Sequence, residues 1–242
     1  MSAFDAWAGL ALPVVCALLV MVAALSAPHE RHARVTREGG TAFLGENIMH
    51  RGYAWVDRLA RLALRLGLGP NTVSWLSLLL GLAAGFGLAG GHFGLAAWLL
   101  ALSGLGDGMD GAMARRQGGG SRGGAVLDSA LDRYVEFFCF AGLVWFFRGT
   151  AALQLLTLAA LLGSFMITYS TAKAEALQVT PPRGWMKRAE RIVWLVAGTA
   201  LAAALPLGGY PGHLVLVGVL AVIALFANLS AILRLHALSR AA

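Results

Sequence analysis

The 242-residue chain contains few charged side chains and few cysteines. Only 13% of its residues are Asp, Glu, Lys or Arg, whereas 58% are hydrophobic, and its mean hydropathy is +0.71. This scarcity of charge excludes an ordinary soluble domain, because uncharged stretches of about 20 residues indicate membrane-spanning helices. The apolar runs also lack the alternation of period two that is typical of strands. Composition therefore predicts an all-α, polytopic transmembrane helical bundle.

The two cysteines, Cys16 and Cys139, both fall within apolar stretches. Lone thiols in such positions are more often small apolar fillers than partners in a disulfide or catalytic nucleophiles. The scarcity of cysteine therefore argues against a disulfide-stabilised fold.

Seven apolar windows are long enough to cross a membrane. They cover roughly residues 7–27, 72–92, 93–114, 124–147, 151–172, 190–207 and 212–233. No basic residue precedes the first window, as one would in a secretory signal peptide, and a basic segment follows it. We therefore expect a retained N-terminal span and a basic cytoplasmic linker in residues 1–45, then a six-span core within residues 46–242.

The formal net charge of +7 is distributed unevenly along the chain. In the seven-span topology the three outer loops together hold one basic residue, Arg148, and all other lysines and arginines lie on the opposite side. This distribution follows the positive-inside rule, so it reflects topology and anionic lipid headgroups rather than nucleic-acid binding. We expect an integral protein of a bacterial inner membrane whose charged segments face the cytoplasm.

Residues 46–67 form a different kind of segment, with apolar residues at helical spacing and arginines largely on the other face. Such a basic amphipathic helix is typical of helices that lie in the membrane interface. A partner-binding helix is the alternative, but the position directly before a span favours the interface. Within the next span, Gly81 and Gly85 are four residues apart, as are Gly87 and Gly91, which predicts close helix packing.

Four aspartates gather between two of the spans. Asp107 and Asp110 are three apart at the end of one predicted helix, and Asp128 and Asp132 are four apart at the start of the next. Either spacing puts both carboxylates on one helix face, and a short connection brings the two pairs together. Aspartates that cap helices and pair with neighbouring arginines are the alternative for any one of them, but four in register favour a cation site.

Oxygen-only ligation at such a site suits Mg²⁺ or Mn²⁺, and two bridged ions suit phosphoryl transfer. Gly108, Gly111 and Gly124 would let a diphosphate or nucleotide approach the backbone, and Arg115 could neutralise phosphate oxygens.

The segment satisfies the pattern D-x2-D-G-x2-A-R-x8-G-x3-D-x3-D at every fixed position. It resembles the signature of the CDP-alcohol phosphotransferases, integral membrane enzymes of phospholipid synthesis, and the resemblance extends over roughly residues 46–235. The matching residues are Asp107, Asp110, Gly111, Ala114, Arg115, Gly124, Asp128 and Asp132.

The resemblance implies a role for each aspartate. Asp107, Asp110 and Asp128 would bind the metal ions, two by the family pattern, and Asp132 would approach a metal while acting as general base for the acceptor hydroxyl. The acceptor oxygen would attack the β-phosphorus of CDP-diacylglycerol and release CMP. The resemblance further implies a homodimer.

The resemblance also indicates the nucleotide site. Gly111, Ala114 and Arg115 would line it, and Asn71 and Ser74 form a family-like PNxx[ST] element for which a helix cap is an equal alternative.

A second basic segment bears on the acceptor. AKAEAL followed by KRAER is similar to the pattern of the phosphatidylinositol-phosphate synthase branch, in which the corresponding basic residues hold inositol phosphate. This similarity points to Lys173, Arg188 and Arg191 as acceptor-binding residues, while the positive-inside rule alone would also explain basic residues there. Glycerol 3-phosphate and serine remain alternative acceptors. For Glu136, one turn after Asp132, we expect a buried ion pair, with Arg133 or with a basic residue of a neighbouring helix.

Two other protein classes use carboxylates in membranes. Membrane prenyltransferases hold a lipid diphosphate through two separated Asp-rich motifs, whereas all four aspartates here belong to one hairpin. A transporter would place acidic groups near the bilayer midplane and often has related halves, neither of which the sequence shows. A purely structural anchor leaves the motif unexplained.

Overall fold

The structure, a computed structural model, describes residues 2–25, 46–119, 121–180 and 184–241. Its elements are α1 (Ala3–Leu25), α3 (Glu46–Arg65), α4 (Pro70–Ala89), α5 (Phe93–Arg116), α6 (Arg122–Phe146), α7 (Ala151–Ala176), α8 (Arg188–Ala204), the 3₁₀ turn η1 (Leu205–Gly208) and α9 (His213–Ala241). No strand occurs in the described ranges, so the predicted all-α class is confirmed. The predicted linker in residues 26–45 lies outside them.

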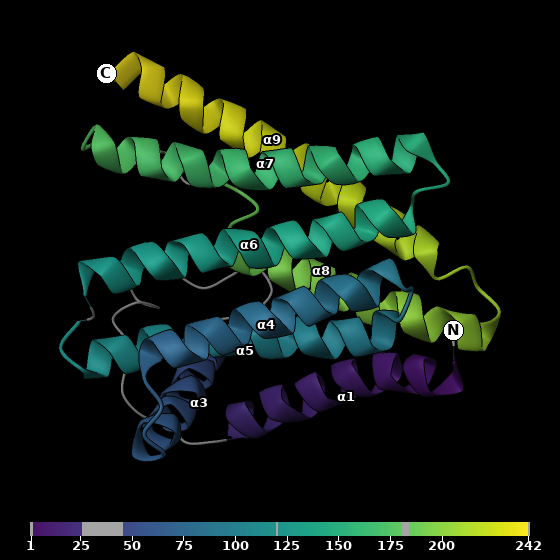
Figure 1. Ribbon diagram of the computed structural model, residues 1–242, viewed down its shortest axis with the longest axis horizontal. Coiled ribbons are helices and arrows are strands. Elements are labelled where there is room, and N and C mark those ends of the chain that lie inside the picture. Colours follow the sequence, from purple (N-terminus) through teal and green to yellow (C-terminus); the bar gives the residue numbers. More distant parts are fainter. Residues whose placement is uncertain (1, 26–45, 120, 181–183, 242) are drawn as a thin grey trace.

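Each of the seven predicted spans corresponds to one long helix. In the described part of the chain, five helices are long and apolar enough to cross a membrane: α1, α4, α7, α8 with η1, and α9. The other two predicted spans, α5 and α6, are 24 and 25 residues long but carry the charged motif, which lowers their hydropathy. Figure 1 shows both running along the bundle beside α4.

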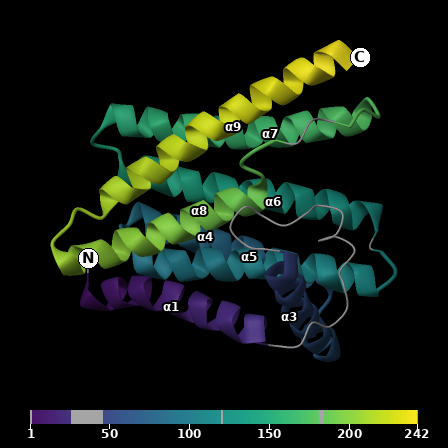
Figure 2. The ribbon, with the colours of Figure 1, turned by 180° about the vertical axis from the view of Figure 1, so that it is seen from behind.

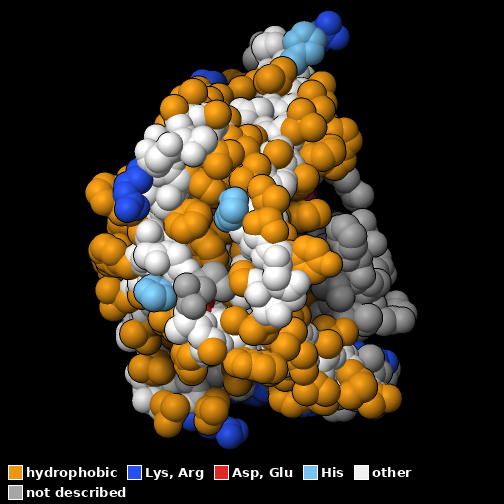
Figure 3. Space-filling model, turned by 90° about the vertical axis from the view of Figure 1, so that its right-hand side faces the viewer, with side chains coloured by type: hydrophobic (Ala, Val, Ile, Leu, Met, Phe, Trp, Pro, Cys, Tyr) orange, Lys and Arg blue, Asp and Glu red, His pale blue; other side chains and the backbone are white. Residues whose placement is uncertain are grey.

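The two ends of the bundle differ in character. The short connections after α4, α6 and η1 lie at the same end as the N-terminus, whereas α3, the α5–α6 turn and the C-terminus lie at the other (Figures 1 and 2). Figure 3 faces the first end and shows mainly hydrophobic side chains and backbone, with Lys and Arg confined to its margins. The arrangement agrees with the predicted topology, in which this end is the outer one.

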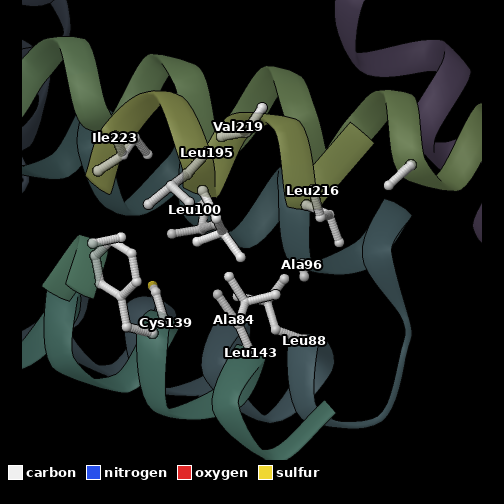
Figure 4. Close-up of a cluster of buried hydrophobic side chains, with 14 of the residues drawn as sticks. Ala84, Leu88, Ala96, Leu100, Cys139, Leu143, Leu195, Leu216, Val219 and Ile223 are labelled. Carbon is white, nitrogen blue, oxygen red and sulfur yellow. The ribbon is translucent and has the colours of Figure 1, made fainter. Parts of the chain in front are cut away.

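The apolar core lies between α4, α5, α6, α8 and α9. Figure 4 shows side chains from these helices meeting there, among them the fully buried Leu88, Leu143 and Leu216. Cys139 belongs to the same cluster, and neither it nor the exposed Cys16 forms a disulfide. The interpretation of Cys139 as an apolar filler therefore agrees with its surroundings.

Helices α4 and α6 approach each other so closely that only glycine fits at the contact. A Cβ atom at Gly85 would lie 2.5 Å from the Phe138 carbonyl oxygen, and one at Gly81 would lie 2.7 Å from Val135 Cγ1. Gly142 faces the Gly85 backbone from the other side. The predicted small-residue packing is confirmed at Gly81 and Gly85, and it sets the separation of two helices that border the aspartates.

The N-terminal helix α1 is bound to the outer end of α5. The Asp5 carboxylate, 2% exposed, accepts a hydrogen bond of 3.1 Å from the backbone N–H of Leu95 in the first turn of α5. Trp98 Nε1 donates to the Ala8 carbonyl oxygen at 2.9 Å, and Gly94 leaves room for the α1 backbone. The carboxylate thereby caps α5 from another helix, with the charge that a helix N-terminus favours.

Helix α3 packs against the other end of α5 and crosses the bundle at a steep angle (Figure 2). Ala60 and Ala63 are buried against a small cluster that includes Met113, and Asp57 forms an ion pair of 3.3 Å with Arg116. Part of the apolar stripe of α3 thus faces protein. Its position in the membrane interface stays a prediction.

Replacing Gly85 with alanine tests the α4–α6 contact. The added methyl group would meet a backbone carbonyl that cannot rotate away, so we expect G85A to lower stability by about 1–3 kcal/mol. The measurement is the thermal unfolding midpoint in detergent. Gly218→Ala is the matched control, because a Cβ at this glycine of α9 meets nothing within 4 Å. Equal midpoints for the two variants would contradict the interpretation.

Candidate active site

The last turns of α5 and the first turns of α6 bring the four aspartates to one place. Carboxylate oxygens of Asp107, Asp110 and Asp128 all lie within 4.8 Å of one another. Asp132, one turn after Asp128, lines the same small pocket. The convergence predicted from the two sequence spacings is therefore present in the fold. Like charges at such separations repel strongly, which means that this arrangement requires compensating groups.

Helix α4 supplies one compensating group. Ser74 Oγ donates a hydrogen bond of 2.6 Å to Asp110 Oδ2, and both residues are buried. The helix cap considered for Ser74 is not its role, because Gly69 occupies the N-cap position without a side-chain bond. Ser74 instead orients a carboxylate of the cluster.

Two further serines of this pocket were not singled out from the sequence. Ser103 Oγ donates to the Ser77 carbonyl oxygen at 2.8 Å, and both residues line the pocket. Their spacing along the helices could have indicated them. Ser77 lies three residues after Ser74 and Ser103 lies one turn before Asp107, so each shares a helix face with a predicted site residue.

Arg188, the first residue of α8, contacts two of the carboxylates. Its Nη1 lies 2.7 Å from Asp107 Oδ2 and its Nη2 lies 2.6 Å from Asp132 Oδ1. The planar guanidinium fork suits two oxygens held side by side. Its Nε is buried and has no hydrogen-bond partner among the described residues. Sequence reasoning identified Arg188 as acceptor-binding but did not foresee its contact with the aspartates.

At Arg191 the structure differs from the prediction of acceptor contact. Its side chain is 1% exposed and forms an ion pair with Glu136, which is 4% exposed, with Nε 2.9 Å from Oε1. Both groups lie inside the bundle, so Arg191 is not open to a substrate. The expected ion pair of Glu136 with a neighbouring helix is present, while Arg133 bonds to Ser129 instead. Breaking such a buried pair costs about 3–5 kcal/mol.

The predicted nucleotide-binding residues lie on the helices that carry or border the aspartates, α4, α5 and α6. The backbone N–H of Gly124 donates to Ser121 Oγ at 2.9 Å, and a Cβ at Gly124 would lie 3.7 Å from Asn71 Oδ1. A Cβ at Gly111 would lie 3.3 Å from Arg115 Nη1, and Ala114 lies on the same helix. Asn71 on α4 and Gly124 on α6 therefore face each other, and the absence of a side chain at Gly124 leaves space beside the Asn71 amide.

Lys173, the remaining predicted acceptor residue, lies in the last turn of α7 with an exposed side chain. It does not line the aspartate pocket.

The chemistry of the donor set fits a divalent cation that prefers oxygen. Three carboxylates with closely spaced oxygens, one of them fixed by Ser74, are suitable ligands for Mg²⁺ or Mn²⁺. The group contains neither histidine nor cysteine, the ligands that zinc prefers.

Comparison with known proteins identifies the family. The model of the CDP-alcohol phosphatidyltransferase family matches residues 68–231. The chain belongs to this family. The matched region begins just before α4 and includes all four aspartates, whereas α1 and α3 precede it. The family resemblance found in the sequence, and with it the prediction of a phosphotransferase, is confirmed.

Known members of the CDP-alcohol phosphatidyltransferase family are similar over most of the same region. The phosphatidylinositol phosphate synthase of Mycobacteroides abscessus is 40% identical over 147 residues, which cover 58% of this chain and 66% of that protein. The chain thus spans about two thirds of the length of the curated relatives that it matches.

Two solved structures of the Mycobacterium tuberculosis phosphatidylinositol phosphate synthase PgsA1 also resemble this chain. The structure with CDP-DAG bound has a TM-score of 0.67 and 31% sequence identity, and the match covers 75% of this chain and 92% of that one. The structure in complex with manganese and citrate has the same TM-score and identity, and 87% of its chain is covered.

Replacing Ser74 with alanine tests whether this serine supports the cation site. Without the hydroxyl, Asp110 loses the hydrogen bond that Ser74 donates to its carboxylate, so we expect S74A to weaken Mn²⁺ binding by about 10- to 100-fold. Isothermal titration of purified protein with Mn²⁺ measures the change. Ser77→Ala is the matched control, because Ser77 is equally buried on α4 and its hydroxyl bonds only to the Val73 carbonyl. Equal affinities for the two variants would refute the assignment.

Proposed function

We propose that the protein transfers a phosphatidyl group from CDP-diacylglycerol to a hydroxyl group of inositol phosphate and releases CMP. The observation that carries this proposal is the group of three carboxylates beside Asp132 and Arg188, in one pocket within the family match. The relatives named above support the same reaction, since they are phosphatidylinositol phosphate synthases and one was solved with CDP-DAG bound.

Asp107, Asp110 and Asp128 would hold the metal, Mg²⁺ or Mn²⁺, and the negative charge of the cluster favours two ions. A bound divalent ion would neutralise charge on the diphosphate and stabilise the departing CMP. Ser74 would keep Asp110 in place, and the manganese in one relative's structure supports this choice of metal.

Asp132 would act as the general base. In our proposal its carboxylate accepts the proton of the acceptor hydroxyl, and the acceptor oxygen forms a bond to the β-phosphorus of the donor. The bond from that phosphorus to the oxygen of CMP breaks, and CMP leaves with the bonding electrons. The described part of the motif contains no serine, cysteine or histidine in the position of a covalent nucleophile, which favours direct displacement.

The acceptor phosphate would bind at Arg188. Two arms of its guanidinium contact Asp107 and Asp132, while the buried Nε has no hydrogen-bond partner among the described residues and could donate to a phosphate oxygen. Binding there would place the acceptor next to the proposed base. Lys173 would contribute positive charge at the entrance. Glycerol 3-phosphate carries the same phosphate chemistry and serine does not, so the two alternatives differ in their dependence on Arg188.

The nucleotide would lie over Gly111, Ala114 and Arg115, with Asn71 and Gly124 on the opposite side. Backbone without side chains at the two glycines allows the diphosphate to approach closely. Arg115 would supply charge to the phosphates.

The five apolar helices and the family assignment make this an integral membrane protein. We further propose a bacterial inner membrane, with the aspartates at the cytoplasmic edge, because the basic residues gather at that end. The homodimer implied by the family resemblance stays a prediction. The transporter alternative finds no support, since the carboxylates lie near one end of the bundle rather than midway along it.

The first test is release of CMP from CDP-diacylglycerol by the purified full-length protein with Mg²⁺ or Mn²⁺. Inositol phosphate, glycerol 3-phosphate, serine and free inositol are compared as acceptors. We expect release that depends on inositol phosphate, and a loss in kcat of about 10²- to 10⁴-fold in Asp132→Asn, because the variant lacks the base. No release with any acceptor, from folded protein that binds Mn²⁺, would overturn the proposed function.

A second test concerns the acceptor. Replacing Arg188 with glutamine removes a charged donor to the phosphate, so we expect R188Q to raise the KM for inositol phosphate by about 10- to 100-fold. The KM for CDP-diacylglycerol should change far less. Lys187→Gln is the control, since it removes the same charge one residue away and Lys187 does not line the aspartate pocket. An unchanged acceptor KM in R188Q would exclude Arg188 from acceptor binding.

A further inference from the structure

Helices α6 and α8 are joined by two ion pairs arranged as successive rungs. Asp132 and Glu136 are one turn apart on α6, and Arg188 and Arg191 are one turn apart on α8. The first rung joins Arg188 to Asp132 beside the pocket, and the second joins Arg191 to Glu136 inside the bundle. The exposed fractions of the side chains are 24% and 21% in the first rung but 1% and 4% in the second.

Direct backbone packing between α6 and α8 contributes little to the position of one helix relative to the other. The backbone of α8 approaches α1, α5 and α9, and that of α6 approaches α4 and α7. The long arginine side chains therefore bridge a wider gap between α6 and α8. Because Asp132 lies on one side of this gap and Arg188 on the other, the geometry of the pocket depends on what fixes the two helices across it.

The buried rung also fixes the residue that precedes α8. Arg191 Nη1 donates a hydrogen bond of 2.7 Å to the carbonyl oxygen of Met186, while Nε and Nη2 both contact Glu136 Oε1. Met186 is itself buried and has a φ of +57°, a left-handed conformation that is uncommon for a residue with a side chain. One guanidinium thus holds the turn from which α8 starts, two residues before Arg188.

We infer that Glu136 and Arg191 form a positioning pair, which sets the first turn of α8 so that Arg188 reaches Asp107 and Asp132. The pair touches neither substrate nor metal and acts through Arg188. This inference assigns Arg191 a role different from acceptor contact and gives Glu136 a role beyond internal charge balance. Only the kinetic tests of this inference, which measure the KM of the acceptor, rest on the proposed function.

The inference predicts a selective kinetic defect. Glu136→Gln removes the charge that holds the Arg191 fork, so we expect the acceptor KM to rise about tenfold, while the KM for CDP-diacylglycerol changes less than about twofold. Arg191→Lys should act alike, because a single ammonium group cannot reproduce the fork that contacts both Glu136 and the Met186 carbonyl. The matched control is Glu175→Gln, the same chemical change at an exposed position of α7.

A double-mutant cycle decides whether the pair acts through Arg188. In the R188Q background, E136Q should change the acceptor KM by less than about twofold, because the residue to be positioned is already absent. Independent effects that multiply in the double variant would overturn the inference. So would equal losses in both KM values and in kcat, which indicate a general loosening of the bundle.

A second cycle does not depend on the reaction. Thermal unfolding midpoints of wild type, E136Q, R188Q and the double variant show whether the stabilisation from Arg188 depends on Glu136. We expect R188Q to lower the midpoint by several degrees in the wild-type background and by less than half as much with E136Q. Equal shifts in both backgrounds would contradict positioning. If the wild type releases no CMP, the proposed function fails while this cycle still gives its result.

If the single variants at Glu136 or Arg191 do not fold, a double variant still tests the inference. Replacing Glu136 and Arg191 together with leucine removes both buried charges, and such exchanges are often tolerated where a single removal is not. This double variant keeps a packed interior but loses the bond to Met186. We expect it to fold and to show the raised acceptor KM. A folded double variant with the acceptor KM of the wild type would refute the positioning role.

Discussion

Mutual repulsion among four carboxylates is the constraint on which the rest of this structure depends. Asp107, Asp110 and Asp128 share one small space with Asp132, and groups from two other helices compensate them. A hydroxyl of α4 binds one carboxylate, and a guanidinium of α8 binds two. The close approach of α5 to α4, where a Cβ at Gly106 would lie 2.2 Å from Ser77 Oγ, brings the first of these groups near enough, and a buried ion pair supports the second.

The solvent exposure of the ion pairs between α6 and α8 decreases from the pocket into the bundle. The pair of Arg188 and Asp132 is partly exposed, so solvent reaches it and its partners can exchange. The pair of Arg191 and Glu136 is shielded from solvent, and its exchange would leave an unpaired charge in an apolar interior. One face of α8 thus carries two arginines of the same chemistry that differ in depth and in partners, which is the basis of the different roles proposed for them.

The sequence was sufficient for the helices and the aspartate group, because apolar length and spacing along one helix are local properties. It could not distinguish Arg188 from Arg191, which share a helix face, since burial depends on how α8 sits against α6. It could not assign Ser74 to Asp110 either, because the contact joins residues 36 positions apart. Spacing predicts which residues share a helix face, whereas the contacts between residues of different helices can be identified only from the folded structure.

The capping of α5 by Asp5 has a consequence for the order in which the protein is assembled in the membrane. Helix α1 is synthesised before α5, but the N–H group that donates to its carboxylate belongs to Leu95, and α1 also packs against α8 and α3. Until those helices have been inserted, Asp5 has no protein donor and must stay hydrated at the membrane surface. Helix α1 consequently reaches its final position only after α5 and α8 have been inserted.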